Sequence, residues 1–544
     1  MADFSTEEGK AANKNGILRA FFVGLALIIQ ILLIISFFTR LSRYAAWVQN
    51  VTEAIALIMV LVIYGQHKTS SMKMPWIILI MAFPVFGIVL YFLIGLDVST
   101  RKMRERYQEI DHVLFPALKD TADPADLEAL KKENPDAGAI AQYLQDYASY
   151  PVYRNTDVEY YDDAAKGLEA QLRDLRKAEH FIFMEYHAIE DKESWWRIEE
   201  VLVERVKAGV HVRVFYDDMG SIGFITTDFV KKMERLGIHC RVFNPFAPGA
   251  NLFLNYRDHR KITVIDNRVG FTGGYNLANE YFNITHPYGQ WKDTGIRVEG
   301  PAVQSMTLTF LEMWNAVRAT DWDDPDALRF LKSYHYTAKE PTGFVQPYAD
   351  SPMDDEQVGE NVYISMANKA EKYCYFITPY LIISDEINSA QRYVYITTPY
   401  LILSDEMQRA LVLAAQRGVD VRIITPGIPD KRMVYGVTRS FYNGLVRNGV
   451  RIFEWTPGFC HAKMSVADDR MATCGTINLD YRSLYHHFEN GCFMADCPAV
   501  QEIKADFDRT FKECREVTDE YRIGRRGTIK RLWQLFLRLF AELM

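Results

Sequence analysis

A pattern of histidine, lysine and aspartate that occurs twice constrains this chain more than any other feature. Residues His259 to Asp266 and His461 to Asp468 both have the form HxKxxxxD, and they lie 202 residues apart. The same offset relates Gly273 to Gly475 and Asn276 to Asn478. One match of this kind is weak, but two matches at one offset predict an internal duplication in which each half contributes the same set of polar groups.

The spacing within each pattern predicts how the side chains are presented. Successive side chains of a β-strand point to opposite faces, so alternate residues share a face. The side chains expected together on one face are His259, Lys261 and Thr263 in the first half and His461, Lys463 and Ser465 in the second. Asp-Asn at 266 and 267 and Asp-Asp at 468 and 469 are typical turn residues. Each strand should therefore fold back and bring Asn276 or Asn478 beside the same face as a hydrogen-bond donor.

Two imidazoles with two ammonium groups suit phosphoryl transfer on a phosphodiester. One neutral histidine attacks phosphorus, the opposite protonated histidine protonates the leaving alcohol, and the lysines with the Asn amides neutralise the charge on the other oxygens. No metal or other cofactor is required. Since each half supplies one histidine, the site is predicted where the halves meet. A carboxylate on each ring would fix its tautomer, and the candidates are Glu489 for His461 and Asp293 for His259.

The rest of the soluble region has an α/β pattern that repeats. A helical stretch followed by Gly209-Val-His-Val-Arg-Val is matched by one followed by Gly418-Val-Asp-Val-Arg-Ile, and Gly237 and Gly449 begin a second matched pair of strands. We therefore expect an α/β fold of two homologous repeats around a shared central site, with the first repeat at 101–331 and the second at 361–523. Residues 332–360, which contain three prolines among acidic and small polar residues, are expected to link the repeats.

The first hundred residues are expected to form a membrane anchor. Ala20 to Phe38 is a stretch of 19 uncharged residues and Trp76 to Leu96 one of 21, near the length that crosses a bilayer as a helix. The predicted spans are about 17–39, 44–65 and 75–96. Glu53 lies inside the middle one, so an interfacial or re-entrant segment is the alternative there. A cleaved signal peptide is the alternative for the first span, although 19 apolar residues exceed a typical signal core.

Charge and cysteine content restrict the partners and the compartment. The chain has 62 Lys and Arg against 70 Asp and Glu, a net charge of −8, which argues against nucleic-acid binding. The seven cysteines include no CxxC pair, so they are interpreted as free thiols of a cytoplasmic catalytic region. His486 and His487 lack the further ligands of a zinc site, and Cys460, which alternates with His461 along a strand, is interpreted as a buried small residue.

Two further segments carry predictions of their own. The basic, apolar C-terminus, residues 524–544, is expected to form an amphipathic helix on anionic lipid, with a packed terminal helix as the alternative. Residues 373–392 and 393–412 form a short tandem repeat that agrees at most positions. Because only the second copy continues directly into the next helix and strand, the first is expected to be an added strand at the sheet edge, a replacement of part of the usual approach, or a bulging insertion.

The duplicated HxKxxxxD pattern resembles that of the phospholipase D superfamily. Within this superfamily, the chain is most similar to the bacterial cardiolipin synthases. The similarity rests on Asn255-Tyr-Arg-Asp-His-Arg-Lys, Gly273-Gly-Tyr-Asn, Thr398-Pro-Tyr and the apolar N-terminus. The resemblance implies a multi-pass protein of the bacterial cell membrane that transfers a phosphatidyl group from one phosphatidylglycerol to another through a phosphohistidine. It implies His259 as the nucleophile and His461 as acid and base, and adds Asp266 and Asp468 to the catalytic set. The sequence leaves open the exchange of the two histidine roles. A membrane-bound phospholipase D that uses water is the alternative enzyme, and a catalytically idle scaffold has no use for two matched motifs. Oligomeric state is not indicated.

Overall fold

The structure, a computed structural model, describes most of the chain between residues 46 and 522. The described ranges are 46–66, 70–92, 101–226, 228–245, 256–318, 325–331, 336–339, 343–354, 356–369, 373–377, 393–397, 420–478 and 480–522, with isolated positions between 25 and 40 and between 412 and 416. The first expected membrane span, the C-terminal segment 524–544, the Asn255 position and the Thr398-Pro-Tyr corner lie wholly or largely outside these residues.

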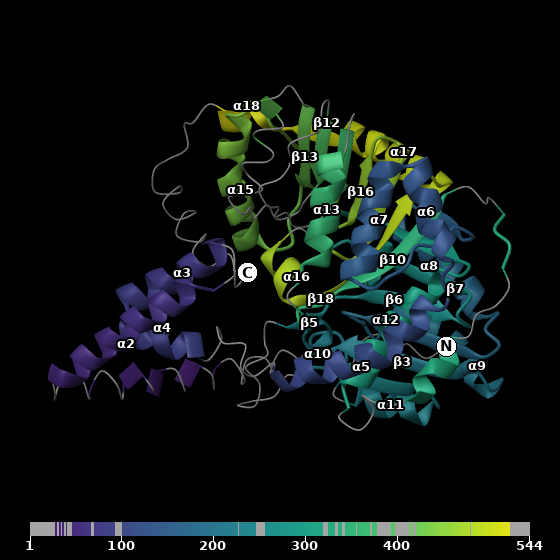
Figure 1. The fold of residues 1–544 in the computed structure, drawn as a ribbon, viewed down its shortest axis with the longest axis horizontal. Coiled ribbons are helices and arrows are strands. Elements are labelled where there is room, and N and C mark those ends of the chain that lie inside the picture. Colours follow the sequence, from purple (N-terminus) through teal and green to yellow (C-terminus); the bar gives the residue numbers. More distant parts are fainter. Residues whose placement is uncertain are drawn as a thin grey trace.

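Three N-terminal helices form an arm beside the main body (Figure 1). They are α2 (Ala46–Tyr64), α3 (Ser70–Ala82) and α4 (Pro84–Leu90). The span expected at 75–96 is thus not one helix. It is interrupted at Phe83, because Pro84 has no N–H to donate and instead starts α4 at a position that tolerates proline. In the described part of the chain, no helix is both long enough and apolar enough to cross a membrane.

The main body is a mixed α/β fold built on two large sheets. The first sheet has the strand order β1-β9-β7-β6-β2-β3-β4. Its strands are β1 (Asp157–Tyr161), β2 (Phe181–Tyr186), β3 (His211–Asp217), β4 (His239–Phe243), β6 (Lys261–Ile265), β7 (Val269–Gly273) and β9 (Gly295–Glu299). Strands β2, β3 and β4 are parallel to one another, whereas β6, β7 and β9 pair in antiparallel fashion.

The second sheet has the order β10-β18-β17-β16-β11-β12-β13-β14-β19. Its strands are β10 (Phe344–Asp350), β11 (Tyr373–Ile377), β12 (Tyr393–Thr397), β13 (Asp420–Pro426), β14 (Arg451–Trp455), β16 (Met464–Ala467), β17 (Met471–Gly475), β18 (His487–Ala495) and β19 (Cys514–Glu516). From β10 to β14 this order matches that of the first sheet from β1 to β4, except that two strands, β11 and β12, stand where the first sheet has β2.

The tandem repeat accounts for that extra strand, and it corrects the expectation of an edge strand. Strand β11 lies inside the sheet, antiparallel to β16 on one side and parallel to β12 on the other. Residue Tyr373 is opposite Tyr393, and the register continues to Ile377 opposite Thr397. Because both copies have the same pattern and direction, each fits the same register. An interior position also pairs the backbone groups that an edge strand would leave open.

The expected linker 332–360 also contains regular structure. Residues Phe344–Asp350 form β10, which pairs along its whole length with β18. Pro347 lies within this strand opposite Cys492. A proline is tolerated here because β10 is at the edge of the sheet, where the missing N–H breaks no ladder bond. The linker predicted from the prolines of this segment is therefore wrong for Phe344–Asp350, which form an edge strand.

Helices cover the sheets and connect the halves. In the first half they are α5 (Arg101–Lys119), α6 (Pro124–Glu133), α7 (Pro135–Tyr147), α8 (Ala164–Leu175), α9 (Glu193–Lys207), α10 (Asp218–Ser221), α11 (Phe229–Arg235), α12 (Val303–Ala316) and the 3-10 helices η3 (Asn279–Phe282) and η4 (Pro325–Phe330). In the second half they are α13 (Val358–Lys369), α15 (Arg432–Val446), α16 (Tyr481–Tyr485), α17 (Pro498–Lys512) and α18 (Thr518–Arg522).

Two of these helices lie between the halves. Every residue of α12 is buried, and α12 packs on β2, β6 and β7 of the first sheet while also contacting β10 of the second. Helix α17 has the matching position, packing on β16, β17 and β18 while contacting β1 of the first sheet. One continuous apolar core includes residues of both halves. The halves therefore share a large buried interface, and the motif strands β6 and β16 lie beside it.

Candidate active site

Short strands from opposite halves hold each motif histidine. His259 lies between β5 (Arg257–Asp258) and β6, and β5 pairs with the start of β18. The backbone N–H of His259 donates to the carbonyl of Phe488 at 2.9 Å. The strand thus begins at Lys261, two residues later than the sequence pattern suggested, and the histidine is held by a strand of the other half.

His461 is held in the same way from the other side. It follows β15 (Gly458–Cys460), which pairs with β8 (Gln290–Lys292) of the first half. Its backbone N–H donates to the carbonyl of Lys292 at 2.8 Å. Cys460 is fully buried, as the alternation of side chains predicted, and burial raises the pKa of its thiol to about 12. This thiol is therefore protonated at neutral pH.

The carboxylates that orient the histidines are crossed between the halves. Nδ1 of His259 lies 2.9 Å from both oxygens of Glu489, and Nδ1 of His461 lies 2.7 Å from Oδ2 of Asp293. The expected pairs, Glu489 with His461 and Asp293 with His259, are therefore wrong. The physical reason is that β18 and β8 extend across the interface to pair with β5 and β15, so each carboxylate reaches the histidine of the opposite half.

Hydroxyl groups hold the Glu489 carboxylate in place. Thr476 Oγ1 donates to Oε2 at 2.6 Å, and Ser483 Oγ donates to Oε1 at 2.5 Å. Together with His259, these donors engage both oxygens of a carboxylate that is fully buried. The sequence interpretation missed both hydroxyls. Thr476 directly follows the duplicated Gly475, so its position beside the motif could have identified it. Ser483 lies in α16, and no sequence motif identifies it.

Each motif lysine contacts the histidine of its own motif. Lys261 Nζ donates to the His259 carbonyl at 2.5 Å. Lys463 Nζ donates to the His461 carbonyl at 2.5 Å, and it lies 2.8 Å and 3.0 Å from Nδ1 and Nε2 of the same ring. Both lysine side chains are buried. Each motif therefore places an ammonium group beside its own histidine, at the backbone of His259 in the first half and at the backbone and ring of His461 in the second.

Burial and mutual repulsion shift the pKa values of these four groups. Burial lowers the pKa of His259 well below its usual range, and Lys261, Lys463 and His461 lower it further. Burial and Lys463 lower the pKa of His461 to about 4, against the opposing effect of Asp293. Burial also lowers the pKa of Lys261 to about 8 and that of Lys463 to about 7. A phosphodiester anion between these groups would favour their charged forms, so the arrangement suits an anionic substrate.

The motif aspartates lie away from this cluster. Asp266 is at the far end of β6, about 16 Å along the strand from Lys261 at ~3.3 Å per residue. Its carboxylate accepts backbone N–H groups of Glu179, His180 and Phe181 at 2.7 to 2.8 Å. Asp468 occupies the matching turn after β16. In contrast to their predicted catalytic role, both lie at the hairpin turn, where Asp266 fixes the start of β2.

The hairpin geometry itself is confirmed. Asp266 and Asn267 have φ values of 54° and 57°, and Asp468 and Asp469 have 52° and 58°. Two consecutive left-handed residues form the tight turn whose twist matches that of paired strands. Each hairpin returns through β7 or β17 and ends at a glycine. A Cβ on Gly475 would lie 2.4 Å from the Asn490 carbonyl, so only glycine allows β17 and β18 to approach this closely.

The remaining predicted residues have mixed positions. Asn276 accepts the N–H of Ala188 at 3.1 Å and donates to the Tyr281 hydroxyl at 2.9 Å, and the Tyr281 ring lies 5.4 Å from the His461 ring. Asn478 is buried with no partner for Oδ1 among the described residues. Thr263 is bound by Gln171 and Tyr186, and Ser465 by Thr473. The two hydroxyls therefore serve the core and not the candidate site.

Other histidines surround His259. The His187 ring lies 5.0 Å and the His487 ring 5.6 Å from the His259 ring. Nitrogen atoms of His259 and His487 and an oxygen of Glu489 lie within 4.8 Å of one another, which is close enough for a metal ion. The Glu489 oxygens, however, already accept three hydrogen bonds in a fully buried position. A metal would have to displace these donors, so the donor set fits orientation of His259 better than metal binding.

The chain is similar to proteins of one family. The family described as "Cardiolipin synthase, PLD-like domain" matches residues 382–511, and that described as "Phospholipase_D-nuclease N-terminal" matches residues 54–95. An uncharacterized protein of Streptococcus mutans is 41% identical over 84% of this chain and 92% of its own length. Cardiolipin synthase 2 of Bacillus cereus is 29% identical over 89% of each chain, and cardiolipin synthase of Halalkalibacterium halodurans is 28% identical over 95% of this chain and 99% of its own.

A solved structure has the same fold. Phosphatidylserine synthase of Haemophilus influenzae superposes with a TM-score of 0.53 over 75% of this chain and 98% of its own, at 13% sequence identity. At this identity the likeness concerns the fold alone.

Proposed function

Because the chain belongs to the phospholipase D-like family that includes the bacterial cardiolipin synthases, we propose that it is a phosphatidyltransferase that makes cardiolipin. Two phosphatidylglycerol molecules are the substrates, and cardiolipin and glycerol are the products. The observation that carries the proposal is the crossed pair of histidine–carboxylate contacts, His259 with Glu489 and His461 with Asp293. It provides one oriented imidazole from each half for the two roles that the reaction needs.

In the first step His259 attacks the phosphorus of phosphatidylglycerol. Its Nδ1–H donates to Glu489, which leaves the lone pair of Nε2 for phosphorus. The P–N bond forms as the bond between phosphorus and the glycerol oxygen breaks. Protonated His461 gives its proton to that oxygen, so glycerol leaves as the neutral alcohol. Asp293 stabilises the protonated ring of His461.

In the second step a hydroxyl of the second phosphatidylglycerol replaces His259. His461, now neutral, removes the hydroxyl proton as the oxygen attacks phosphorus and the P–N bond breaks. Cardiolipin leaves and both histidines return to their initial states. Lys261 and Lys463 neutralise the charge that develops on the other phosphate oxygens, so the chain's own groups supply the positive charge of the site.

The finer organisation follows the same proposal. The two halves are homologous repeats, supported by the strand order that both sheets share and by the matched motif positions. The N-terminal region attaches the protein to the bacterial cell membrane in several passes, supported by the exposed apolar side chains of α2, which include Leu57 (58% exposed) and Leu61 (63%). The catalytic region faces the cytoplasm, supported by the free cysteines among the described residues.

Single replacements of the two histidines test the assignment. His259→Ala and His461→Ala, each in the full-length protein with phosphatidylglycerol vesicles, should lower cardiolipin formation by several powers of ten, because each removes a group that acts in both steps. His180→Ala, which removes an exposed imidazole outside the site, is the matched control. A His259 or His461 variant that retains a tenth of the wild-type rate would overturn the assignment.

A further inference from the structure

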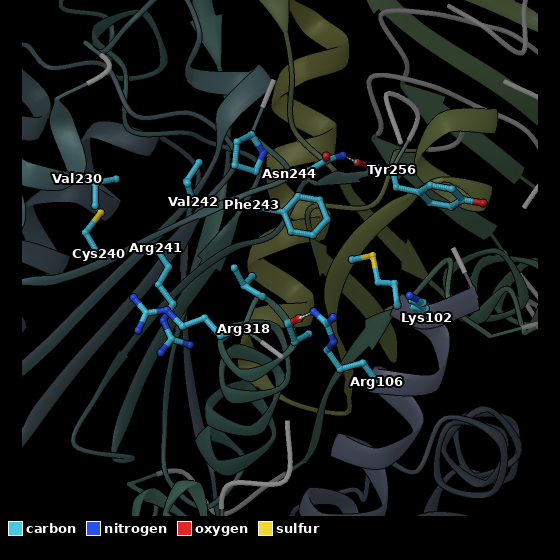
Figure 2. Close-up of a pocket in the computed structure, with 14 residues that line it drawn as sticks. Lys102, Arg106, Val230, Cys240, Arg241, Val242, Phe243, Asn244, Tyr256 and Arg318 are labelled. Atoms are coloured by element: carbon cyan, nitrogen blue, oxygen red, sulfur yellow. Dashed lines mark hydrogen bonds between the residues drawn. The ribbon is translucent and has the colours of Figure 1, made fainter. Parts of the chain in front are cut away.

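A cavity of about 690 Å³ lies at the outer edge of the first sheet (Figure 2). Its walls come from the start of α5, strand β4, the residues that follow β4 and α12, and Tyr256. None of the catalytic groups lines it. The volume is in the range of sites for small organic ligands.

The polar lining of this cavity is strongly basic. Lys102, Arg106, Arg241 and Arg318 contribute four positive charges, and none of the 14 lining residues is Asp or Glu. This contrasts with a chain whose net charge is −8. Four cations at one cavity, with no acid among the described residues of its lining, favour an anion there.

Two of the cations are fixed by the end of α12. Arg106 Nη1 donates to the Ala316 carbonyl at 2.8 Å. Arg241 Nη1 donates to the Trp314 carbonyl at 2.5 Å, and its guanidinium lies 4.1 Å from the centre of the Trp314 ring. Neutralising the negative end of a helix would explain these two arginines. A guanidinium has five N–H donors, however, so Arg106, which uses Nη1 for Ala316, retains donors for a ligand.

The end of α12 does not explain Lys102, whereas Arg318 directly follows the C-cap Val317, where a cation also favours the negative end of the helix. Lys102 and Arg318 are exposed, and within the described part of the chain neither forms an ion pair with a carboxylate or a hydrogen bond to α12. They stand at the same cavity as Arg106 and Arg241. Among the described lining residues, no carboxylate balances the charge of the four.

The remaining walls are apolar. The partly exposed apolar lining includes Val242 of β4, Val317 after α12 and Met103 of α5, whereas Phe243 is buried. A free phosphate ion would use the cations but not these walls. An amphipathic anion uses both. We propose that this cavity binds one anionic phospholipid at a site distinct from the catalytic histidines, with the headgroup phosphate on the cations and an acyl chain along the partly exposed Val242 and Val317.

The position of the cavity agrees with this ligand. Helix α5, which carries Lys102 and Arg106, begins at Arg101, soon after the apolar helix α4 ends at Leu90. Basic residues next to an apolar anchor are typical of contacts with anionic lipid at the membrane surface. This part of the argument rests on the membrane attachment proposed above, whereas the lining of the cavity does not.

Lipid binding by the full-length protein in a neutral detergent tests the proposal. Native mass spectrometry counts the phosphatidylglycerol molecules retained at increasing lipid concentration. The wild type should retain one molecule more than a Lys102→Gln/Arg318→Gln double variant, whose affinity at the cavity should fall at least tenfold. Arg101→Gln is the matched control, because it removes a charge from the same helix that is paired with Glu105 at 2.9 Å. It should bind like the wild type.

Two further arms identify the ligand. Val242→Trp fills the apolar wall and keeps all four cations, so it should also lose the extra phosphatidylglycerol. Phosphatidylcholine should not replace phosphatidylglycerol, and millimolar inorganic phosphate should not displace it. Equal retention by the double variant and the wild type would overturn the proposal. Full displacement by inorganic phosphate, or equal binding of phosphatidylcholine, would also overturn it. Bound lipid is counted by mass, whether as phosphatidylglycerol or as any cardiolipin formed from it, so the outcome does not require the proposed reaction.

Discussion

Replacing the two site carboxylates should slow different steps of the reaction. Glu489→Gln removes the charge that orients His259, the proposed nucleophile, and Asp293→Asn removes the charge that supports His461, the proposed acid and base. With phosphatidylglycerol both variants should be slow. With a phosphatidyl ester of p-nitrophenol the leaving oxygen departs without a proton, so formation of the intermediate no longer needs His461.

The structure sets the size of the effect. Glu489 is fully buried and accepts from His259, Thr476 and Ser483. A hydrogen bond to a charged partner contributes about 1.5 to 3 kcal/mol, which at ~1.36 kcal/mol per factor of ten corresponds to about 10- to 150-fold in rate. A glutamine that selects the wrong tautomer costs more, about 10⁴-fold in the comparable triad replacement. We therefore expect the Glu489→Gln burst to slow by about 10² or more.

The assay is stopped-flow measurement of the p-nitrophenolate burst on mixed micelles. Glu489→Gln should slow the burst itself. Asp293→Asn should keep a burst within about threefold of the wild type and slow only the later turnover, in which His461 removes the acceptor proton. Glu105→Gln, an exposed carboxylate outside the site, is the control. A burst that is slowed in Asp293→Asn and retained in Glu489→Gln would refute the assignment of roles and identify His461 as the nucleophile.

Three other results are expected. Deletion of residues 373–392 should give a folded, active protein, because β12 has the register needed to move by ~4.8 Å and pair with β16 in place of β11; an aggregated or inactive product would contradict this. The kcat/KM profile should decline above pH 4, where His461, with a pKa of about 4, loses the proton that it gives to glycerol. The decline should steepen through pH 7 to 8, where Lys463 and Lys261, with pKa values of about 7 and about 8, lose the charge that binds phosphate; a flat profile to pH 9.5 would contradict it. Stability should fall as pH decreases from 6.5 towards 4, since the folded protein holds His461 with a pKa of about 4 and the unfolded chain binds that proton first. At ~1.36 kcal/mol per pKa unit the loss is about 3 kcal/mol, and urea denaturation of His461→Asn at pH 7 and 4.5 should show a smaller loss than the wild type.

Local features of the site were predictable from the sequence. The paired turn residues after each motif specify a tight hairpin, and the structure has left-handed φ values at Asp266 and Asn267. The alternation of side chains correctly placed Cys460 in the core, and it placed each lysine beside its histidine. These results depend on residues within one hairpin, where period and turn chemistry determine the geometry.

Contacts across the interface were not predictable in the same way. A carboxylate that follows a motif within one half was assigned to the histidine of that half, but strand pairing between β5 and β18 brings Glu489 to His259. The sequence pattern does not indicate whether the end of a strand pairs within its own half or with a strand of the other half. The predicted position of the first copy of the tandem repeat was wrong for a related reason. Chain continuity identified which copy leads on to β13, but it does not say that the other copy is accepted between β12 and β16.

The products that the purified full-length protein forms from phosphatidylglycerol distinguish phosphatidyl transfer to a second lipid from hydrolysis. Substrate labelled separately in the glycerol headgroup and in the acyl chains is incubated with EDTA present, and the lipids and the released glycerol are quantified together. We expect one released glycerol for each cardiolipin formed, with no phosphatidic acid beyond a small hydrolytic fraction. Phosphatidic acid and glycerol in equal amounts with no cardiolipin would contradict it, because water would then be the acceptor at this site.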